Sequence, residues 1–346
     1  MESDNKFFEL EDRNQTDELY EHYNIDVDKG QAQLRIDKFL MTKIENVTRN
    51  QLQIAIQAGN ILVNEKAVKA NYKVKPLDNI KVVFNTPPRV VEIIPEDIPI
   101  EVVYEDDDIM IVNKPAGLVV HPGFNNYTGT LLNALTYYLS KEHLDKPIVP
   151  YLVHRIDKDT SGILLVAKNE VAQARLANQF VEHSIERKYI ALAWGNFDDE
   201  EGTVEGHIGR SLKDRRIMTV FPDGEFGKSA VTHYKVVERF SYITCIECQL
   251  ETGRTHQIRA HMQHINHPLF NDATYGGNVI RKGTTFSKYK QFVDNCFKVM
   301  PRQSLHAKSL GFIHPTTKEY IFFDSDLPTD FQDVMDKWRA YTINHG

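Results

Sequence analysis

The order of strand-like and helix-like stretches after about residue 98 restricts the fold of this chain more than any other feature. Strand-like stretches include "GILLVAKN", "RKYIALAWG", "AVTHYKVVERF" and "YITCIECQL", and helical spacing appears in "TLLNALTYYL", "NEVAQARLANQFVEH" and "RTHQIRAHMQHI". Helices and strands do not alternate strictly, and several strands lie close enough in sequence to pair antiparallel. The sequence therefore predicts one α+β domain over residues 98–346, with a mixed, mainly antiparallel central sheet.

A smaller α+β unit is predicted over residues 33–84. It has helical spacing in "RIDKFLMTKI" and "TRNQLQIAIQAGN", followed by short strand-like stretches. Gly59 follows the second helix, where a left-handed cap is expected. The proline-containing residues 85–97 are interpreted as an extended linker. Residues 1–32 are acidic and lack a sustained period, so we expect a mostly disordered extension.

The net charge of −7 argues at first against a nucleic-acid partner. Residues 1–30 alone carry ten Asp/Glu against three Lys/Arg, however, so the rest of the chain sums to zero. Residues 35–84 carry nine Lys/Arg against four acids. The charge pattern thus leaves RNA binding open, and an ordinary solvated charged surface is the alternative. The candidate RNA contacts in this unit are Arg35, Lys38, Arg49 and Lys66.

Composition indicates a soluble cytoplasmic protein. No stretch approaches the length of an apolar membrane span, and the acidic first residues do not resemble a secretory signal. Cys245 and Cys248 form a CxxC pattern, but the run around them is strand-like, which would place the two thiols on opposite faces. With no second cysteine pair in the sequence, we expect no metal there.

The stretch "HRIDKDTSG" places one carboxylate among cations. Asp157 follows His154 and Arg155 and precedes Lys158. Positive neighbours favour the ionised carboxylate, which a nucleophilic or charge-stabilising role at the anomeric carbon of a sugar requires. Turn and capping chemistry is the alternative for the residues that follow, namely Asp159, Thr160, Ser161 and Gly162.

"ERKYIALAWG" predicts a strand that sorts its side chains between two faces. Tyr189 shares one face with two alanines, an arrangement that leaves space for a flat ligand to stack on the ring. The other face is aliphatic and is expected to pack in the core. A half-exposed strand tyrosine without a function is the alternative.

"LETGRTHQIRAHMQHINHPLFND" predicts a turn followed by a helix. Arg254 and Arg259 lie near the start of this helix, where free backbone amides already favour anions. His261, His264 and His267 raise the possibility of zinc. No cysteine or carboxylate supplies an obvious further ligand, so a metal site is not expected.

Together these stretches resemble the RluA/RluD family of pseudouridine synthases. "HRIDKDTSG", "RKYIALAWG" and "GRTHQIRAHM" correspond to three family motifs, and "NKPAGLVVHPG" and "LHAKSLGFIHP" to flanking ones, in the same order. The basic unit in front resembles the S-four-type RNA-binding domain. The resemblance runs from about residue 33 to the end and leaves the acidic extension unexplained.

The resemblance implies a pseudouridine synthase catalytic fold and an RNA isomerase that uses no cofactor or metal. The resemblance points to a uridine of large-subunit ribosomal RNA, which would be flipped out of the RNA and rejoined to its sugar through carbon 5. Asp157 would be the nucleophile or sugar-stabilising carboxylate, Tyr189 would stack on the base and help remove the carbon 5 proton, and Arg259 would pair with Asp157. Arg155 would fill the gap left by the base or contact phosphate. The further RNA contacts implied are His154, Arg254 and His256.

Several alternatives remain at this stage. The substrate is transfer RNA in one of them, and in another the protein is a non-catalytic RNA-binding ribosome-assembly factor. A glycoside hydrolase would pair Asp157 with Asp159, although a spacing of two residues suits such a pair poorly. We expect a monomer whose partner is RNA, with no DNA and no membrane partner.

Overall fold

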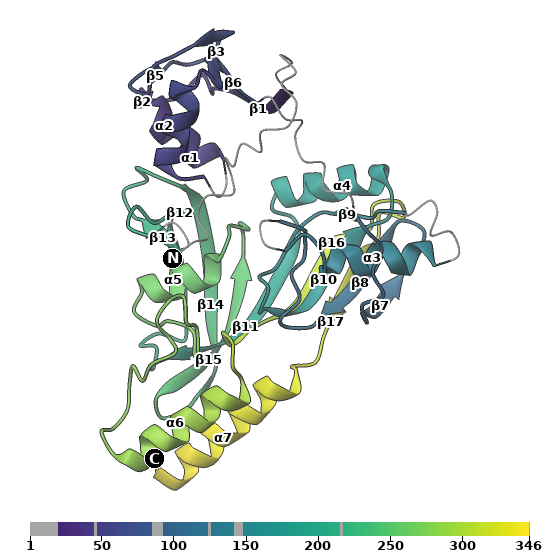
Figure 1. Ribbon diagram of the computed structural model, residues 1–346. Helices are drawn as coiled ribbons and strands as arrows, with labels where there is room; N and C mark the ends of the chain where they lie inside the picture. The colour runs from purple at the N-terminus through teal and green to yellow at the C-terminus, as the bar shows by residue number, and fades with distance from the viewer. Residues whose placement is uncertain are drawn as a thin grey trace. The chain divides into compact units, whose positions relative to one another are not determined.

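A computed structural model describes residues 20–44, 47–84, 93–123, 126–141, 148–214 and 217–345 (Figure 1). The chain divides into two compact units, residues 1–92 and 93–346, which are described separately. Within the described ranges, no helix combines the length and the apolar character needed to cross a membrane.

The first unit packs two helices against small sheets, as expected for residues 33–84. Thr48 caps the second helix with a reciprocal hydrogen-bond pair to Gln51, and Gly59 follows that helix with a φ of 78°. Its four-stranded sheet has the order β1-β6-β3-β4, and β2 pairs with β5. The elements are β1 (Tyr20–Asp26), β2 (Leu34–Arg35), α1 (Ile36–Lys43), α2 (Arg49–Gln57), β3 (Ile61–Val63), β4 (Lys66–Ala67), β5 (Lys73–Val74) and β6 (Asn79–Phe84).

Part of the acidic extension is folded, so the expectation of disorder is wrong from residue 20 onward. Strand β1 pairs antiparallel with β6, and Val27 is buried in the core of the unit. Ile25 also packs against this core, while most of the polar side chains of β1 stay exposed. Backbone pairing along β1, with Ile25 in the strand and Val27 just after it, joins to the core a segment whose composition suggested disorder. Residues 1–19 lie outside the described residues.

The second unit is built on a sheet with the order β13-β12-β14-β15-β11-β16-β10-β8-β7, to which β17 adds by pairing with β16 and β9 by pairing with β10. The β10/β16 pair is parallel and the other pairs are antiparallel, so the predicted α+β class is confirmed. The strands are β7 (Glu101–Glu105), β8 (Ile109–Lys114), β9 (Tyr151–Leu152), β10 (Ser161–Ala167), β11 (Glu186–Trp194), β12 (Glu201–Arg210), β13 (Met218–Phe221), β14 (Lys228–Arg239), β15 (Ile243–Leu250), β16 (Leu305–Ile313) and β17 (Tyr320–Asp324). The helices are α3 (Leu131–Ser140), α4 (Glu170–Val181), α5 (Gln257–His264), α6 (Ser287–Val299) and α7 (Thr329–His345).

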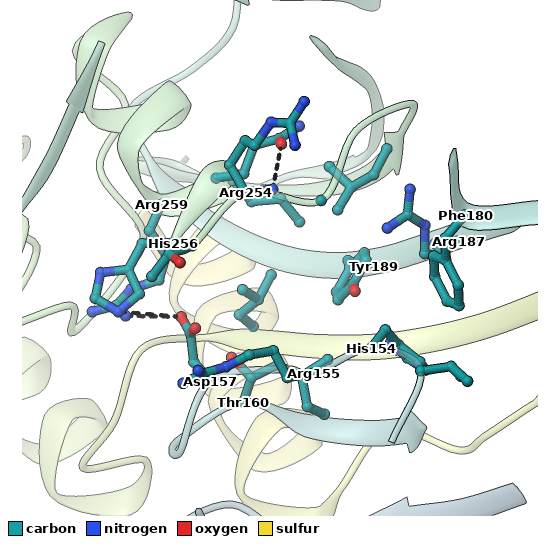
Figure 2. A pocket seen from close by; sticks show the side chains of 18 of the residues that line it. His154, Arg155, Asp157, Thr160, Phe180, Arg187, Tyr189, Arg254, His256 and Arg259 are labelled. Atoms are coloured by element: carbon teal, nitrogen blue, oxygen red, sulfur yellow. Dashed lines mark hydrogen bonds and ion pairs between the residues drawn. The ribbon is translucent and has the colours of Figure 1, made fainter. Parts of the chain in front are cut away.

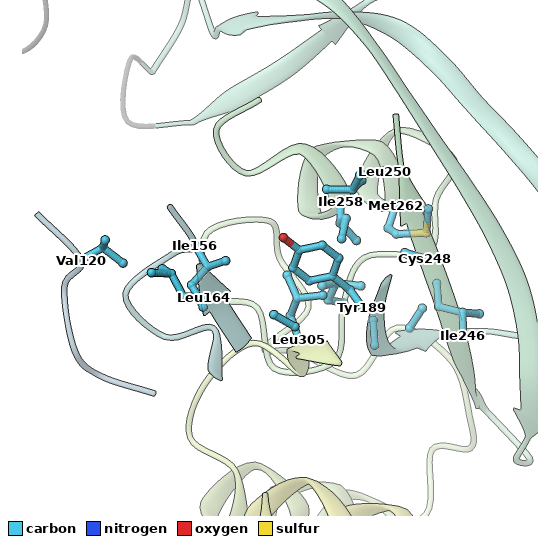
Figure 3. Packing of buried hydrophobic residues seen from close by; sticks show 14 of the residues in the cluster. Val120, Ile156, Leu164, Tyr189, Ile246, Cys248, Leu250, Ile258, Met262 and Leu305 are labelled. Atoms are coloured by element: carbon cyan, nitrogen blue, oxygen red, sulfur yellow. The ribbon is translucent and has the colours of Figure 1, made fainter. Parts of the chain in front are cut away.

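Strand β11 is buried on both faces. Tyr189 and its two alanine neighbours pack in one core cluster with Ile258 and Met262 of α5 (Figure 3). Trp194 and the aliphatic residues of the opposite face pack against α6 and α7, which lie side by side in Figure 1. The alternation predicted for this strand is confirmed. The alternative of a half-exposed Tyr189 is wrong, because its residue is only 8% exposed.

The predicted linker is too long at its C-terminal end. The Asn133 side-chain amide donates to Ile94 O at 2.8 Å, and the Gly129 amide donates to the Glu96 carboxylate at 2.9 Å. These bonds attach residues 94–96 to the start of α3, within the second unit. Residues 85–92 of the predicted linker lie outside the described residues.

Candidate active site

A cavity of about 490 Å³ opens in the second unit where its strands β10, β11 and β16 meet the segment before α5 (Figure 2). Its lining comes from the loop between β9 and β10, the end of α4, the start of β11 and residues 250–259. All three sequence stretches singled out for chemistry therefore contribute to one cavity.

The loop that carries Asp157 is held by a glycine with a specific backbone requirement. Gly162 has a φ of 113° and pairs with Ala307 of β16, and a Cβ at this position would overlap the Ala307 carbonyl. The neighbouring Ser161 hydroxyl lies 2.9 Å from His306 Nδ1. Ser161 and Gly162 of the "DTSG" sequence thus join this loop to β16, which is a structural role of the kind the alternative proposed.

Lys114, in the "NKPAGL" stretch, is hydrogen-bonded to the same loop. Its residue is 1% exposed, and its Nζ donates to the carbonyls of Pro115, Leu118 and Lys158 at 2.8–2.9 Å. Burial lowers the pKa of Lys114 to about 7, while Asp159 and Asp157 oppose this shift. One buried ammonium group therefore joins two sequence stretches that were recognised independently.

The nearest basic side chains to the Asp157 carboxylate come from the region of α5, and among the described residues only Arg259 forms an ion pair with it. Arg259 Nη1 donates to Asp157 Oδ2 at 2.9 Å, and His256 Nε2 lies 3.9 Å from the same oxygen. The predicted pairing of Arg259 with Asp157 is therefore present. Within the described part of the chain neither Arg155 nor Lys158 forms an ion pair with this carboxylate, although they are its neighbours in sequence. The Asp157 side chain remains 20% exposed at the cavity.

Arg259 is fixed by a second carboxylate that the sequence did not reveal. Its Nε and Nη2 donate to Asp272 at 2.7 and 2.9 Å, and its guanidinium lies 5.1 Å from the centre of the Tyr275 ring. Burial would lower the pKa of Arg259, but hydrogen bonds and charge from Asp272 and Asp157 raise it further above its ordinary value. The guanidinium is consequently a fixed positive charge aimed at Asp157.

His256 stands at the N-cap of α5 in the left-handed backbone region, with a φ of 53°. Its Nδ1 lies 3.1 Å from the Tyr275 hydroxyl. Burial lowers the pKa of His256, and Asp157 only partly opposes this. His256 is thus neutral near pH 7 and can offer RNA hydrogen bonds but no charge.

Tyr189 lines the cavity between Asp157 and Arg187 (Figure 2). Burial raises the pKa of its phenol, Arg187 opposes the shift and Asp157 adds to it. The side chain is therefore a neutral phenol at neutral pH, suited to stacking and to hydrogen-bond donation.

His154 serves the fold more than the predicted RNA contact. Its Nε2 accepts the Leu165 N–H at 2.9 Å, and its ring lies 5.0 Å from that of Phe180. Burial, with a smaller contribution from Arg187, lowers the pKa of His154 to about 3. It carries no positive charge for phosphate at neutral pH. Arg155 is exposed, and Arg254 holds the Ser229 carbonyl through its Nε at 2.9 Å.

The predicted RNA contacts of the first unit fall into two groups. Arg35 and Arg49 both donate to the buried Asp37, each at 2.9 Å. Burial would raise the pKa of Asp37, but hydrogen bonds from Arg35, Gln53 and Arg49 lower it to about 2. Lys38 and Lys66 are exposed. The two lysines are therefore the freer cations of the predicted set.

Two groups of possible metal ligands have other tasks. Asp106, Asp108 and His314 lie close together, but His314 Nδ1 accepts backbone N–H groups and its Nε2 lies 3.0 Å from Asp106. No ring nitrogen is left for a metal. Cys245 and Cys248 are buried in different core clusters on opposite faces of β15, which is the arrangement expected from their strand spacing.

Comparison with known proteins identifies relatives along most of the chain. Residues 108–264 match the family described as RNA pseudouridylate synthase, and residues 34–80 match the S4 domain. An uncharacterized RNA pseudouridine synthase of Chlorobaculum parvum is 48% identical over 320 residues, which cover 91% of this chain and 97% of that protein. Ribosomal large subunit pseudouridine synthase D of Zymomonas mobilis is 41% identical, covering 86% of this chain and 92% of that protein. The solved structure of human RNA pseudouridylate synthase domain containing 1 superimposes with a TM-score of 0.52 at 25% identity, covering 72% of this chain and 90% of that one.

Proposed function

Because the chain belongs to the RNA pseudouridine synthase family, we propose that it converts uridines of large-subunit ribosomal RNA to pseudouridines, with Asp157 as the essential carboxylate. The observation that supports this most is the geometry of Asp157, which is partly exposed at the cavity and paired with Arg259 at 2.9 Å. The ribosomal substrate is supported by the names of several relatives, which act on the large subunit.

The reaction requires that one bond be exchanged for another at the sugar. The N1–C1′ bond of uridine breaks, the C5–C1′ bond forms, the proton on carbon 5 leaves, and N1 gains a proton. No electrons are gained or lost, so no redox cofactor is needed. Asp157 stabilises the electron-poor C1′ or forms a covalent adduct, and the hydrogen bond from Arg259 fixes the orientation of the carboxylate.

Tyr189 stacks on the flipped base at the floor of the cavity. Its raised pKa supports the stacking role more directly than the removal of the carbon 5 proton, because a neutral phenol is a poor base. If Tyr189 does accept that proton, it must first pass its own to another group. The exposed Arg155 is suited to replace the flipped base in its stack or to contact phosphate.

The first unit adds affinity for the RNA backbone through exposed lysines, of which Lys38 and Lys66 are the strongest candidates. We also place the protein in the cytoplasm, since its three cysteines are unpaired thiols. That it is a monomer and that it does not bind DNA stay predictions.

Release of tritium from uridine labelled at carbon 5 tests the proposal, with large-subunit ribosomal RNA and transfer RNA transcripts assayed in parallel. Release from ribosomal RNA alone is the expected result. Release from transfer RNA alone would show that transfer RNA, and not ribosomal RNA, is the substrate. Binding without release from either RNA would favour an assembly factor, and free uracil among the products would indicate a hydrolase.

A further inference from the structure

Arg187 is a buried cation that the reaction described above does not use. It lies at the start of β11, and its residue is 6% exposed. It lines the cavity at the end opposite Asp157, with Tyr189 between them (Figure 2). Burying a charge in this position costs desolvation free energy unless an anion pairs with it.

The protein itself supplies little to Arg187. Its Nη2 donates to the Glu251 carbonyl at 3.2 Å, and its guanidinium lies 5.3 Å from the centre of the Phe180 ring. Its Nε is buried without a hydrogen-bond partner, and no carboxylate of the described residues forms an ion pair with it. A guanidinium has five N–H donors, so most of its hydrogen-bonding capacity is open.

The other charged side chains around Arg187 are mostly positive and do not neutralise it. The cavity lining holds the four arginines Arg155, Arg187, Arg254 and Arg259 against one carboxylate, Asp157. Arg259 is already paired with Asp157 and Asp272. Arg254 lies close enough to Arg187 to repel its charge. This end of the cavity is therefore positive in a chain whose net charge is −7.

The backbone nearby leaves room for this guanidinium. A Cβ on Gly253 would lie 2.7 Å from Arg187 Nη1, although the φ of Gly253 is not one that requires glycine. Any larger residue at position 253 would displace the charged group from its place in the cavity wall.

We propose that Arg187, with Arg254 beside it, binds a backbone phosphate of the RNA strand next to the flipped uridine. The inference rests on the proposed function and adds a positioning contact to it. A phosphate supplies several acceptor oxygens for the open N–H groups and neutralises the uncompensated charge. Held at this end, it fixes the nucleotide so that the ring stacks on Tyr189 and C1′ faces Asp157.

The test measures the affinity of the full chain for ribosomal RNA hairpins whose loop phosphates are replaced one at a time by uncharged methylphosphonates. We expect Arg187→Gln to weaken binding of the unmodified hairpin by about 10-fold or more, the effect of losing a charged hydrogen bond. One methylphosphonate should weaken wild-type binding by a similar factor and should have little further effect on the variant. Gly253→Ala should weaken binding in the same direction.

Lys188→Gln is the matched control, because it removes the same charge from the next residue, which faces away from this cavity and pairs with Glu247. Its affinity should stay within about twofold of wild type, since exposed ion pairs contribute little. The melting temperature supplies a second readout. Arg187→Gln should melt at or above the wild-type temperature, because it removes an uncompensated buried charge.

Three outcomes would overturn the inference. The first is that Arg187→Gln binds the unmodified hairpin within about twofold of wild type. The second is that no single methylphosphonate weakens wild-type binding as much as Arg187→Gln does. The third is that Arg187→Gln melts below the wild-type temperature and keeps its RNA affinity, which would show that Arg187 only stabilises the fold. Tritium release by the wild-type chain is followed separately. If release fails while the binding losses appear, the proposed function is wrong and the phosphate site stands.

Discussion

Replacing Asp272 with Asn should weaken both the fold and the reaction, because Asp272 holds Arg259 in place. The Asp272 side chain is fully buried and accepts two hydrogen bonds from Arg259, at 2.7 and 2.9 Å. It also accepts the backbone N–H groups of Thr274 and Tyr275 at 3.0 and 3.2 Å. An amide in its place removes the negative charge and turns one acceptor into a donor that faces the guanidinium.

The structure sets the size of the effect. Breaking a buried ion pair costs about 3–5 kcal/mol, and the lower value applies because Arg259 keeps Asp157 as a partner. In a domain of roughly this size, each kcal/mol lowers the melting temperature by about 2–4 °C, so a decrease of about 6–12 °C is expected. A displacement of Arg259 by about 1 Å would slow turnover by about 100-fold.

Thermal unfolding and tritium release measure the two effects separately. Turnover is measured well below the melting temperature of the variant, with RNA affinity expected to stay within about threefold because Asp272 does not line the cavity. Glu238→Gln is the control. Glu238 accepts a similar pair of bonds from Arg339, at 2.9 and 2.7 Å, but the two side chains are 34% and 43% exposed. Its loss should cost at most about 1 kcal/mol and leave turnover unchanged.

Turnover near the wild-type rate in a destabilised Asp272→Asn would refute the reasoning. It would show that Asp272 supports only the fold and that Arg259 reaches Asp157 without it.

Three further predictions concern other parts of the chain. Gly162→Ala should destabilise the protein by about 3 kcal/mol or more, because Gly162 has a φ of 113° and an added Cβ would overlap Ala307 of β16. Gly117→Ala is the control: its φ is 87° but no atom lies within 4 Å of an added Cβ, so thermal unfolding should show a loss of only about 1–2 kcal/mol. The pKa of Asp37 is lowered in the folded protein to about 2 from an ordinary 3.8, so its ionised form contributes about 2 kcal/mol to the free energy of unfolding above about pH 4. This contribution is lost as the pH falls toward 2. Denaturant unfolding curves of Asp37→Asn should lack this pH dependence. Lys38→Gln and Lys66→Gln should each reduce the slope of log affinity against log salt by up to about 0.9, and an unchanged slope would remove these lysines from the RNA contact.

The features predicted best from the sequence were those that follow from a regular alternation of side chains along a strand. The alternation along β11 placed Tyr189 and Trp194 on opposite faces, and the same period separated Cys245 from Cys248. The sequence predicted poorly where the period was short or masked by acidic residues, as in β1, whose Ile25 packs against the core together with Val27, the residue that follows the strand.

Charge neighbours in space could not be read from the sequence. Reasoning from the residues alone placed only sequence neighbours around Asp157. Its pairing with Arg259, 102 residues further along the chain, was expected from the family resemblance. Asp272 and Arg187 carried no recognisable signal, since their importance depends on which carboxylate meets which guanidinium after folding. His154 and His256 were expected to contact RNA, but burial lowers the pKa of both rings, so neither supplies a positive charge to phosphate at neutral pH.

Single-turnover tritium release by Asp157→Asn, with Asp159→Asn as the matched control in the same loop, tests the central claim most directly. The account predicts that Asp157→Asn loses at least about a thousandfold in rate while binding RNA normally, and that Asp159→Asn stays within about tenfold of wild type. Turnover by Asp157→Asn within about tenfold of wild type would contradict the assignment of Asp157 as the essential carboxylate.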